Sequence, residues 1–242
     1  MYKVVHRSQE RGTSANGSRK GYYTFSYGNY YAEDRINFGV MRVFNEEIID
    51  GGGGYDATHH DNMEIIMLPL AGSFEYGDNL GNNTSVAVGQ AQILSAGTGI
   101  VHNLYNSSLS DTSRYLQIWI YPREYDCLPD YTKVRLADAV HGQWREVASP
   151  MGSEFVLPVE QNVWISTTEL NAGDTIIYGM QDADNGVYLS VLSGEVEVLD
   201  TMLARGDGMG VCDHGEVLKI EAKAESEILL IELPMQRAAA DR

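Results

Sequence analysis

Two stretches of the chain have the same order of apolar and polar residues. The first reads MEIIMLPLAGSFEY over residues 63–76 and AVGQAQIL over 87–94. The second reads GVYLSVLSGEVEV over 186–198 and ARGDGMGV over 204–211. In each, an apolar run leads through a glycine turn to an alternating run and then to a second glycine turn. Apolar and alternating runs bounded by turn residues are typical of strands, so the repeat predicts two similar β modules.

Further short runs of this kind extend the prediction over most of the chain. We expect strands at 2–6, 38–44, 63–70, 73–76, 85–88, 91–95, 100–105, 115–121, 155–158, 163–170, 174–180, 188–192, 195–199, 209–212, 218–222 and 227–233. The segments 7–20 and 51–54 (GGGG) are interpreted as loops, and 122–150, with its prolines, as a connection whose middle carries a turn or a short helix. So many short strands, in two sets, predict an all-β protein of two β-barrels or jelly rolls.

Composition supports this interpretation and excludes several classes of partner. The chain has 242 residues, 43% of them hydrophobic, with 25 glycines and 15 tyrosines, which suits two β domains with their own cores. We place the boundary near residue 125, with an N-terminal domain at 1–125 and the connection and C-terminal domain at 126–242. A net charge of −17 argues against nucleic acid as a partner. No run is long enough to predict a membrane span. Cys127 and Cys212 lie too far apart for a disulfide framework, and the N-terminus has no signal-peptide pattern, so a cytoplasmic location is expected.

Histidines gather around the first module. His59 and His60 precede it and His102 follows it, whereas the second module has only His214. On one continuous strand, His60 and Glu64 would share a face and His59 would point the other way. Two imidazoles and a carboxylate form a facial triad suited to Fe(II) or a similar divalent metal, with His59 as a substitute ligand. The alternative is that the rings lie exposed in a turn and His102 bonds a neighbouring loop. No catalytic residue is assigned.

Aromatic and apolar side chains near these histidines are candidate walls of a small-molecule pocket. They are Phe25, Met63, Tyr105 and Trp119, each of which could equally be ordinary core packing. Trp144 and Trp164 either line a cleft between the domains or belong to the core.

Several segments of the chain resemble the pirin family, especially the shorter bacterial pirin-like bicupins. They are TFSYGNYY (24–31), FGVMRVFNEEII (38–49), HHDNMEI (59–65), LAGSFEYGDNLGN (70–82), QILSAGTGIVHNLYN (92–106) and LQIWIYP (116–122). The resemblance implies a tandem cupin fold with a metal site in the N-terminal barrel. It also implies Fe as the metal, and similarity of some bacterial members to quercetin 2,3-dioxygenases. The family's ligands are usually a His-x-His pair, a later His, and a Glu two residues beyond it.

This sequence departs from that ligand pattern at two positions. Thr58 stands at the first His position and Leu104 at the Glu position, leaving His60 and His102. One interpretation is therefore a degenerate site that binds a small molecule without catalysis and holds no metal. A second is a quercetin 2,3-dioxygenase-like oxygenase whose metal is held by His60, His102 and either Glu64 or His59. A third, by analogy with nuclear pirins, is a transcriptional co-regulator that acts through a protein partner.

Overall fold

The computed structural model describes residues 1–213, 215 and 217–236, so His214 lies outside the described residues. The described chain is built from strands, together with one short 3-10 turn, η1 (Ser8–Glu10). The strands before the first repeat are β1 (Tyr2–His6), β2 (Gly12–Asn16) and β3 (Arg19–Tyr23). The first barrel then contains β4 (Met41–Ile49), β5 (Gly54–His60), β6 (Glu64–Ala71), β7 (Ser73–Asp78), β8 (Asn83–Ala87), β9 (Gln90–Ser95), β10 (Ile100–Asn106) and β11 (Ser113–Ile120).

The remaining strands belong to the connection and the second barrel. The connection contributes β12 (Asp130–Arg135), β13 (Arg145–Ser149) and β14 (Leu157–Pro158). The second barrel contains β15 (Trp164–Leu170), β16 (Thr175–Gly179), β17 (Asn185–Ser193), β18 (Glu195–Val198), β19 (Thr201–Ala204), β20 (Gly208–Cys212), β21 (Val217–Ala222) and β22 (Ser226–Pro234). The predicted all-β class is confirmed.

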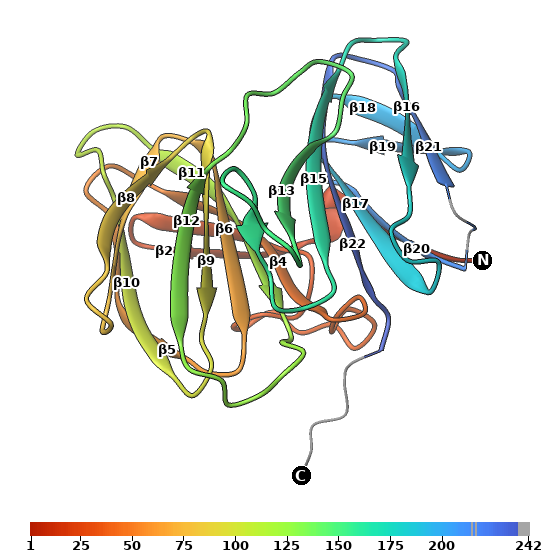
Figure 1. The fold of residues 1–242 in the computed structure, drawn as a ribbon. Helices are drawn as coiled ribbons and strands as arrows, with labels where there is room; N and C mark the ends of the chain where they lie inside the picture. The colour runs from red at the N-terminus through yellow and green to blue at the C-terminus, as the bar shows by residue number, and fades with distance from the viewer. Residues whose placement is uncertain (214, 216, 237–242) are drawn as a thin grey trace.

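Each barrel consists of a large and a small sheet facing one another (Figure 1). Among the described residues, the strand pairs are antiparallel except β13 with β14, which run parallel. The first has a seven-stranded sheet in the order β12-β9-β6-β11-β4-β3-β2 and a four-stranded sheet β5-β10-β7-β8. The second has β1-β20-β17-β22-β15-β13-β14 and β16-β21-β18-β19. Strands β4 to β11 therefore correspond one by one to β15 to β22, and the duplication seen in the sequence is a duplication of the fold.

The two large sheets exchange strands between the N-terminal and C-terminal parts of the chain. The N-terminal strand β1 pairs with β20 of the second barrel, from Tyr2 opposite Cys212 to His6 opposite Gly208. In return, β12 of the connection pairs with β9 of the first barrel. Both exchanged strands lie at sheet edges, where they satisfy backbone groups that would otherwise be unpaired. Neither barrel is therefore closed by its own continuous segment of chain.

Several segments interpreted as loops are strands in the structure. The segment 7–20 contains β2 and the first residues of β3, and 51–54 ends on the first residue of β5. The connection carries β12 and β13 where a turn or short helix was expected. The sheet imposes this, because an adjacent strand supplies hydrogen bonds that local sequence preference does not reveal. At Gly54 a side chain is excluded, since a Cβ would lie 2.3 Å from the Tyr105 ring and 2.5 Å from the Leu104 carbonyl oxygen.

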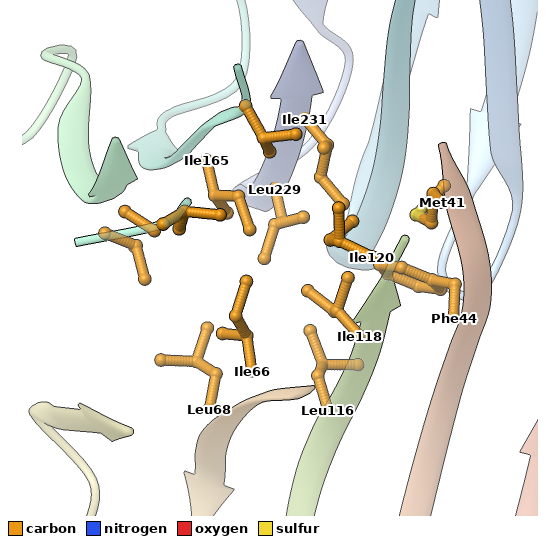
Figure 2. Close-up of a cluster of buried hydrophobic side chains, with 14 of the residues drawn as sticks. Met41, Phe44, Ile66, Leu68, Leu116, Ile118, Ile120, Ile165, Leu229 and Ile231 are labelled. Carbon is orange, nitrogen blue, oxygen red and sulfur yellow. The ribbon is translucent and has the colours of Figure 1, made fainter. Parts of the chain in front are cut away.

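Three groups of buried apolar side chains form the core. One fills the first barrel, a second fills the second barrel, and the largest lies between the two large sheets. Figure 2 shows part of this shared core, in which Ile66, Leu116 and Ile118 of the first barrel meet Ile165, Leu229 and Ile231 of the second. Alternation along each strand assigns its side chains to one core or the other.

That alternation fixes the direction of every residue on the central strands. On β6, Ile65 and Met67 point into the first barrel, whereas Ile66 and Leu68 point into the shared core. On β22, Ile228 and Leu230 point into the second barrel, whereas Leu229 and Ile231 point into the shared core. Because both faces of these strands are buried, they read as continuous apolar runs in the sequence.

Two further findings concern the cysteines and the possibility of a membrane-spanning helix. Both cysteines are free thiols, Cys127 exposed and Cys212 partly buried. Among the described residues no helix has the length and apolar character needed to cross a bilayer.

Candidate functional site

Two histidines meet inside the first barrel, on neighbouring strands of its small sheet. In the β5–β10 pairing His60 lies opposite Ile100, and His102 lies opposite Thr58. The centroids of the His60 and His102 rings are 5.0 Å apart. Trp119 of β11 reaches across the barrel to place its ring 4.8 Å from that of His60, nearly perpendicular to it at 78°. The structure thus brings together the two histidines that the sequence selected.

Two tyrosines that were not selected from the sequence complete the surroundings of His102. The Tyr76 ring stacks on its imidazole at 5.5 Å between centroids, and the Tyr55 ring meets it edge-on at 5.7 Å. Tyr76 could have been found, because it lies two residues after the apolar Phe74 on β7. Residues two apart on a strand share a face, so both point inward. Tyr55 could not, because no strand was predicted over residues 54–60.

Both imidazoles are neutral at neutral pH. Burial lowers the pKa of His60 to about 4, and the neighbouring His59 lowers it further while Asp61 opposes the change. Burial also lowers the pKa of His102 to about 4, with His60 adding to the effect and the Asn103 backbone opposing it. A neutral imidazole offers one nitrogen as an acceptor or metal ligand and the other as a donor.

His102 has a hydrogen-bonding capacity that the described protein atoms leave unused. The residue is 1% exposed, and neither Nδ1 nor Nε2 has a hydrogen-bond partner of ordinary geometry. The Trp119 indole nitrogen, buried in the same barrel, also has none. Unpaired buried polar atoms cost about 1–3 kcal/mol each, so these atoms are candidates for a hydrogen bond with water or a ligand.

The two positions that depart from the family's ligand pattern carry no ligand in the structure either. The Thr58 hydroxyl donates to the Asp56 carbonyl oxygen at 3.2 Å. Leu104 is fully buried in the apolar core of the first barrel. Within the described ranges, no three His, Cys, Asp or Glu side chains lie close enough to hold a metal ion together.

His59 lies on the other side of β5 from the histidine pair. Its neighbour His60 faces inward, so strand alternation directs His59 outward, where its side chain is 60% exposed. Its Nδ1 lies 3.9 Å from an Asp61 carboxylate oxygen. A bond from this ring to a metal between His60 and His102 would require β5 to turn over locally.

Glu64 does not share a strand face with His60, which corrects that part of the sequence interpretation. Asp61, Asn62 and Met63 separate the two residues, since β5 ends at His60 and β6 begins at Glu64. Asn62 has a positive φ of 45°, which breaks the alternation on which the prediction relied. On β6 the parity of Glu64 is that of Ile66 and Leu68, so it faces the second barrel.

The Glu64 carboxylate has a structural partner there. It accepts backbone hydrogen bonds from Glu160 and Gln161 at 3.1 Å each, and a third from the Ser95 hydroxyl at 3.3 Å. Burial raises its pKa to about 7 in spite of these bonds. Glu64 therefore connects the first barrel to the segment leading into β15.

The four proposed wall residues have different locations. Trp119 contacts His60 as described. Met63 is partly buried against the first barrel's core, at the edge of a cavity of about 120 Å³ that Glu64 also lines. Tyr105 is 40% exposed on the outer face of β10, with its hydroxyl bonded to Asp56. Phe25 belongs to the shared core against His6 and Tyr188, so it does not line the first barrel.

These residues do not fit the full metal centre that the family resemblance implies. Two imidazoles are in place, a third ligand is absent from the inner face among the described residues, and a leucine fills the carboxylate position. Two ligands hold a divalent ion weakly compared with four.

Each half of the chain contains a large and a small sheet with equivalent strand order, and this duplication defines a bicupin. Comparison with known proteins makes the class more specific. The family model described as Pirin matches residues 4–120, and that of the quercetinase C-terminal cupin domain matches 146–233. The chain belongs to the pirin family.

Individual relatives cover nearly the whole chain. The quercetin 2,3-dioxygenase of Escherichia coli K12 is 34% identical over 230 residues, spanning 95% of this chain and 98% of that protein. A pirin-like protein of Caulobacter vibrioides is 32% identical over 223 residues, or 91% and 95%. The crystal structure of YhhW from Escherichia coli superposes with a TM-score of 0.91 at 32% identity, covering 98% and 99%. A structure of the same pirin in complex with nickel(II) gives 0.89 at 31% identity, covering 96% and 99%.

Proposed function

We propose that the first barrel binds a small aromatic molecule carrying hydroxyl or carbonyl oxygens, and that it does so without the family's metal chemistry. The observation that carries the proposal is His102, buried with both ring nitrogens unpaired beside His60, Trp119 and Tyr76. Neutral imidazoles donate to and accept from such oxygens, and the flanking rings offer stacking surfaces. Thr58 and Leu104 support the absence of a metal-dependent step.

A second candidate is a metal-dependent oxygenase that acts on flavonols. It is supported by the relatives named quercetin 2,3-dioxygenase and by the related pirin crystallised with nickel(II). It requires a third ligand at the histidine pair, and His59 and Glu64 both face away from it. The two candidates therefore differ in whether wild-type protein holds a metal at all.

The experiment compares wild type with a variant in which the missing ligands are restored, Thr58→His with Leu104→Glu. Thr58 lies directly opposite His102, so a histidine there would add an imidazole to the pair. We expect wild type to be metal-poor by elemental analysis and inactive on quercetin. We expect the restored variant to bind Fe(II) or Ni(II) at least ~10-fold more tightly, which corresponds to ~1.4 kcal/mol. The single variant Thr58→His serves if the buried glutamate prevents folding.

Ligand binding is measured separately, with quercetin as the probe and a chelator present. Wild type should bind the flavonol, and a His60→Ala, His102→Ala variant should lose most of the affinity. A wild type that carries about one equivalent of metal, lost in the double alanine variant, and that turns over quercetin would establish the second candidate instead. Chelator-treated wild type with no flavonol affinity would refute the first.

A further inference from the structure

A separate pocket opens in the second barrel, which no part of the proposed function uses. It has a volume of about 300 Å³, and its lining includes Trp144, Glu146, Trp164, Ser166, Tyr178 and Gln181. These residues come from β13, β15 and β16 and the segments beside them, so the pocket lies where the large and small sheets of this barrel face each other. The two tryptophans considered for an inter-domain cleft in the sequence thus share a pocket within one barrel.

Strand pairing shows that the large sheet presents its inner face to this pocket. Trp164 lies opposite Glu232, and Ser166 lies opposite Leu230, whose side chain is in the second barrel's core. Directly opposed residues of antiparallel strands share a face, so Trp164 and Ser166 also point inward. Glu146 lies opposite Ser166 on the other side of β15 and shares that face.

The aromatic walls are held in place by hydrogen bonds. The Trp144 indole donates to the Ile177 carbonyl oxygen at 2.9 Å, and the Tyr178 hydroxyl donates to Glu232 at 2.9 Å. The Trp144 and Tyr178 rings are 5.4 Å apart between centroids and nearly perpendicular at 83°. Two fixed rings at a right angle, with Trp164 half-buried nearby, form adjacent walls of a cage.

The charge in the pocket is negative and uncompensated. Glu146 is exposed and, among the described residues, makes no ion pair or hydrogen bond, and no Lys, Arg or His lines the pocket. The adjacent Arg145 is directed elsewhere, since its guanidinium donates to the Thr167 hydroxyl at 3.1 and 3.2 Å. The carboxylate of Glu232 lies behind Tyr178, where it is occupied by protein donors. The protein's net charge of −17 adds a field that attracts cations.

We infer that this pocket of the second barrel binds a small organic cation of the quaternary ammonium type. Aromatic faces attract such a cation through the negative potential of their rings, and a nearby carboxylate adds a charge contact. A soft, weakly hydrated methylammonium group suits a cage of indole and phenol rings better than a metal ion does. The site is independent of the histidine pair, so neither proposal depends on the other.

The test uses choline as the probe and 3,3-dimethyl-1-butanol, in which a carbon replaces the charged nitrogen, as its neutral match. Binding is measured by calorimetry and tryptophan fluorescence at constant ionic strength. We expect choline to bind with a Kd of ~1 mM or tighter and the neutral alcohol to bind at least ~10-fold more weakly. Equal binding of the two probes would refute a cation site.

Variants locate the site. Glu146→Gln and Trp164→Leu should each weaken choline binding at least ~5-fold, in line with about 1 kcal/mol for a cation–π or charge contact. Glu169→Gln, on the opposite face of β15, is the matched control and should leave it unchanged, as should His60→Ala with His102→Ala. Because Glu146 is exposed, its variant is expected to fold normally. No choline binding up to about 10 mM, or binding that Glu146→Gln and Trp164→Leu leave intact, would overturn the inference.

Discussion

The two barrels have the same strand order but place different chemistry at the same point. In the first, Trp119 of β11 reaches across to His60 of β5. In the second, Glu232 of the corresponding strand β22 reaches across to Tyr178 of β16. The sheet pairings are equivalent, so the backbone does not determine which barrel carries imidazoles and which carries an aromatic cage. A handful of inward-facing positions does, which is why function has to be argued from the site and not from the fold.

The buried carboxylates Glu232 and Glu64 also differ between the two barrels. Glu232 lies inside its own barrel, fully buried, and accepts hydrogen bonds from Tyr178, Asn185 and the backbone of Gln181 and Asp182. Glu64 lies outside its own barrel and binds the chain of the other one. One carboxylate therefore stabilises a single barrel, and the other stabilises the contact between two.

The largest predicted effect comes from removing these two carboxylates in turn. Glu232→Ala leaves several buried donors without an acceptor, each costing about 1–3 kcal/mol, so we expect a loss of at least ~3 kcal/mol in the free energy of unfolding. Glu64→Ala should lose less, ~1–2 kcal/mol, because it borders a cavity of about 120 Å³ that water can enter. Denaturant unfolding measures both, with Glu169→Ala as an exposed control.

Equal losses in Glu64→Ala and Glu232→Ala would show that the contact between barrels is as strong as the interior network. Unchanged flavonol binding in Glu64→Ala would agree with its placement away from His60.

The fold was largely predictable from the sequence because its central strands are buried on both faces. Runs such as EIIMLPLA (64–71) and EILLIEL (227–233) are apolar at nearly every position, and glycine turns separate them. Strands β2, β3, β5, β12 and β13 carry mixed patterns, and they form because a neighbouring strand pairs with them. Their existence depends on tertiary contacts that no local pattern contains.

The site was predictable only in part, for a related reason. His60 and His102 were identified by residue type and by their positions beside the first module. Glu64 was assigned to their face by counting alternation through Asn62, whose positive φ interrupts it. Tyr55 lies on β5, a strand that the sequence did not predict, and the pocket around Trp144 brings together three segments of the connection and the second barrel. A site assembled across sheets becomes visible when the pairing is known.

Acid should weaken the packing around His102 in the first barrel. The pKa of His102 is about 4 in the folded protein and about 6.5 in an unfolded chain, so the unfolded state binds its proton first. The stability that the neutral ring contributes is complete above pH 6.5 and is lost as pH falls from 6.5 towards 4, by about 3 kcal/mol at most. His102→Phe keeps a ring against Tyr76 but cannot titrate. We expect the variant to lose less stability than wild type between pH 7 and 4.5. Groups common to both proteins, such as Glu47 and Glu64, cancel in this comparison.

Hydrogen exchange assigns that acid effect to a barrel. In wild type at about pH 4.5, amides of β5 and β10 should lose protection ahead of those of β16 and β21. Parallel loss in both barrels, or identical pH profiles for wild type and His102→Phe, would contradict a specific role for the histidine pair.

The smallest predicted effect tests whether equivalent turns of the two barrels tolerate an alanine equally well. Gly72 and Gly194 occupy the same hairpin in the two barrels, with φ of 68° and 79°. Alanine at either position destabilises the folded state by about 1–2 kcal/mol, because it must adopt a left-handed backbone conformation. At Gly72 the added Cβ would meet Ser113 at 3.2 Å, a contact that a slight shift relieves. At Gly194 it would lie 2.2 Å from the Glu225 carbonyl oxygen, and the backbone itself must move. Gly194→Ala should therefore lower the unfolding free energy by ~1 kcal/mol more than Gly72→Ala, as measured in denaturant. Matching losses would mean that the second hairpin relaxes freely, and that the two barrels differ in their inward side chains alone.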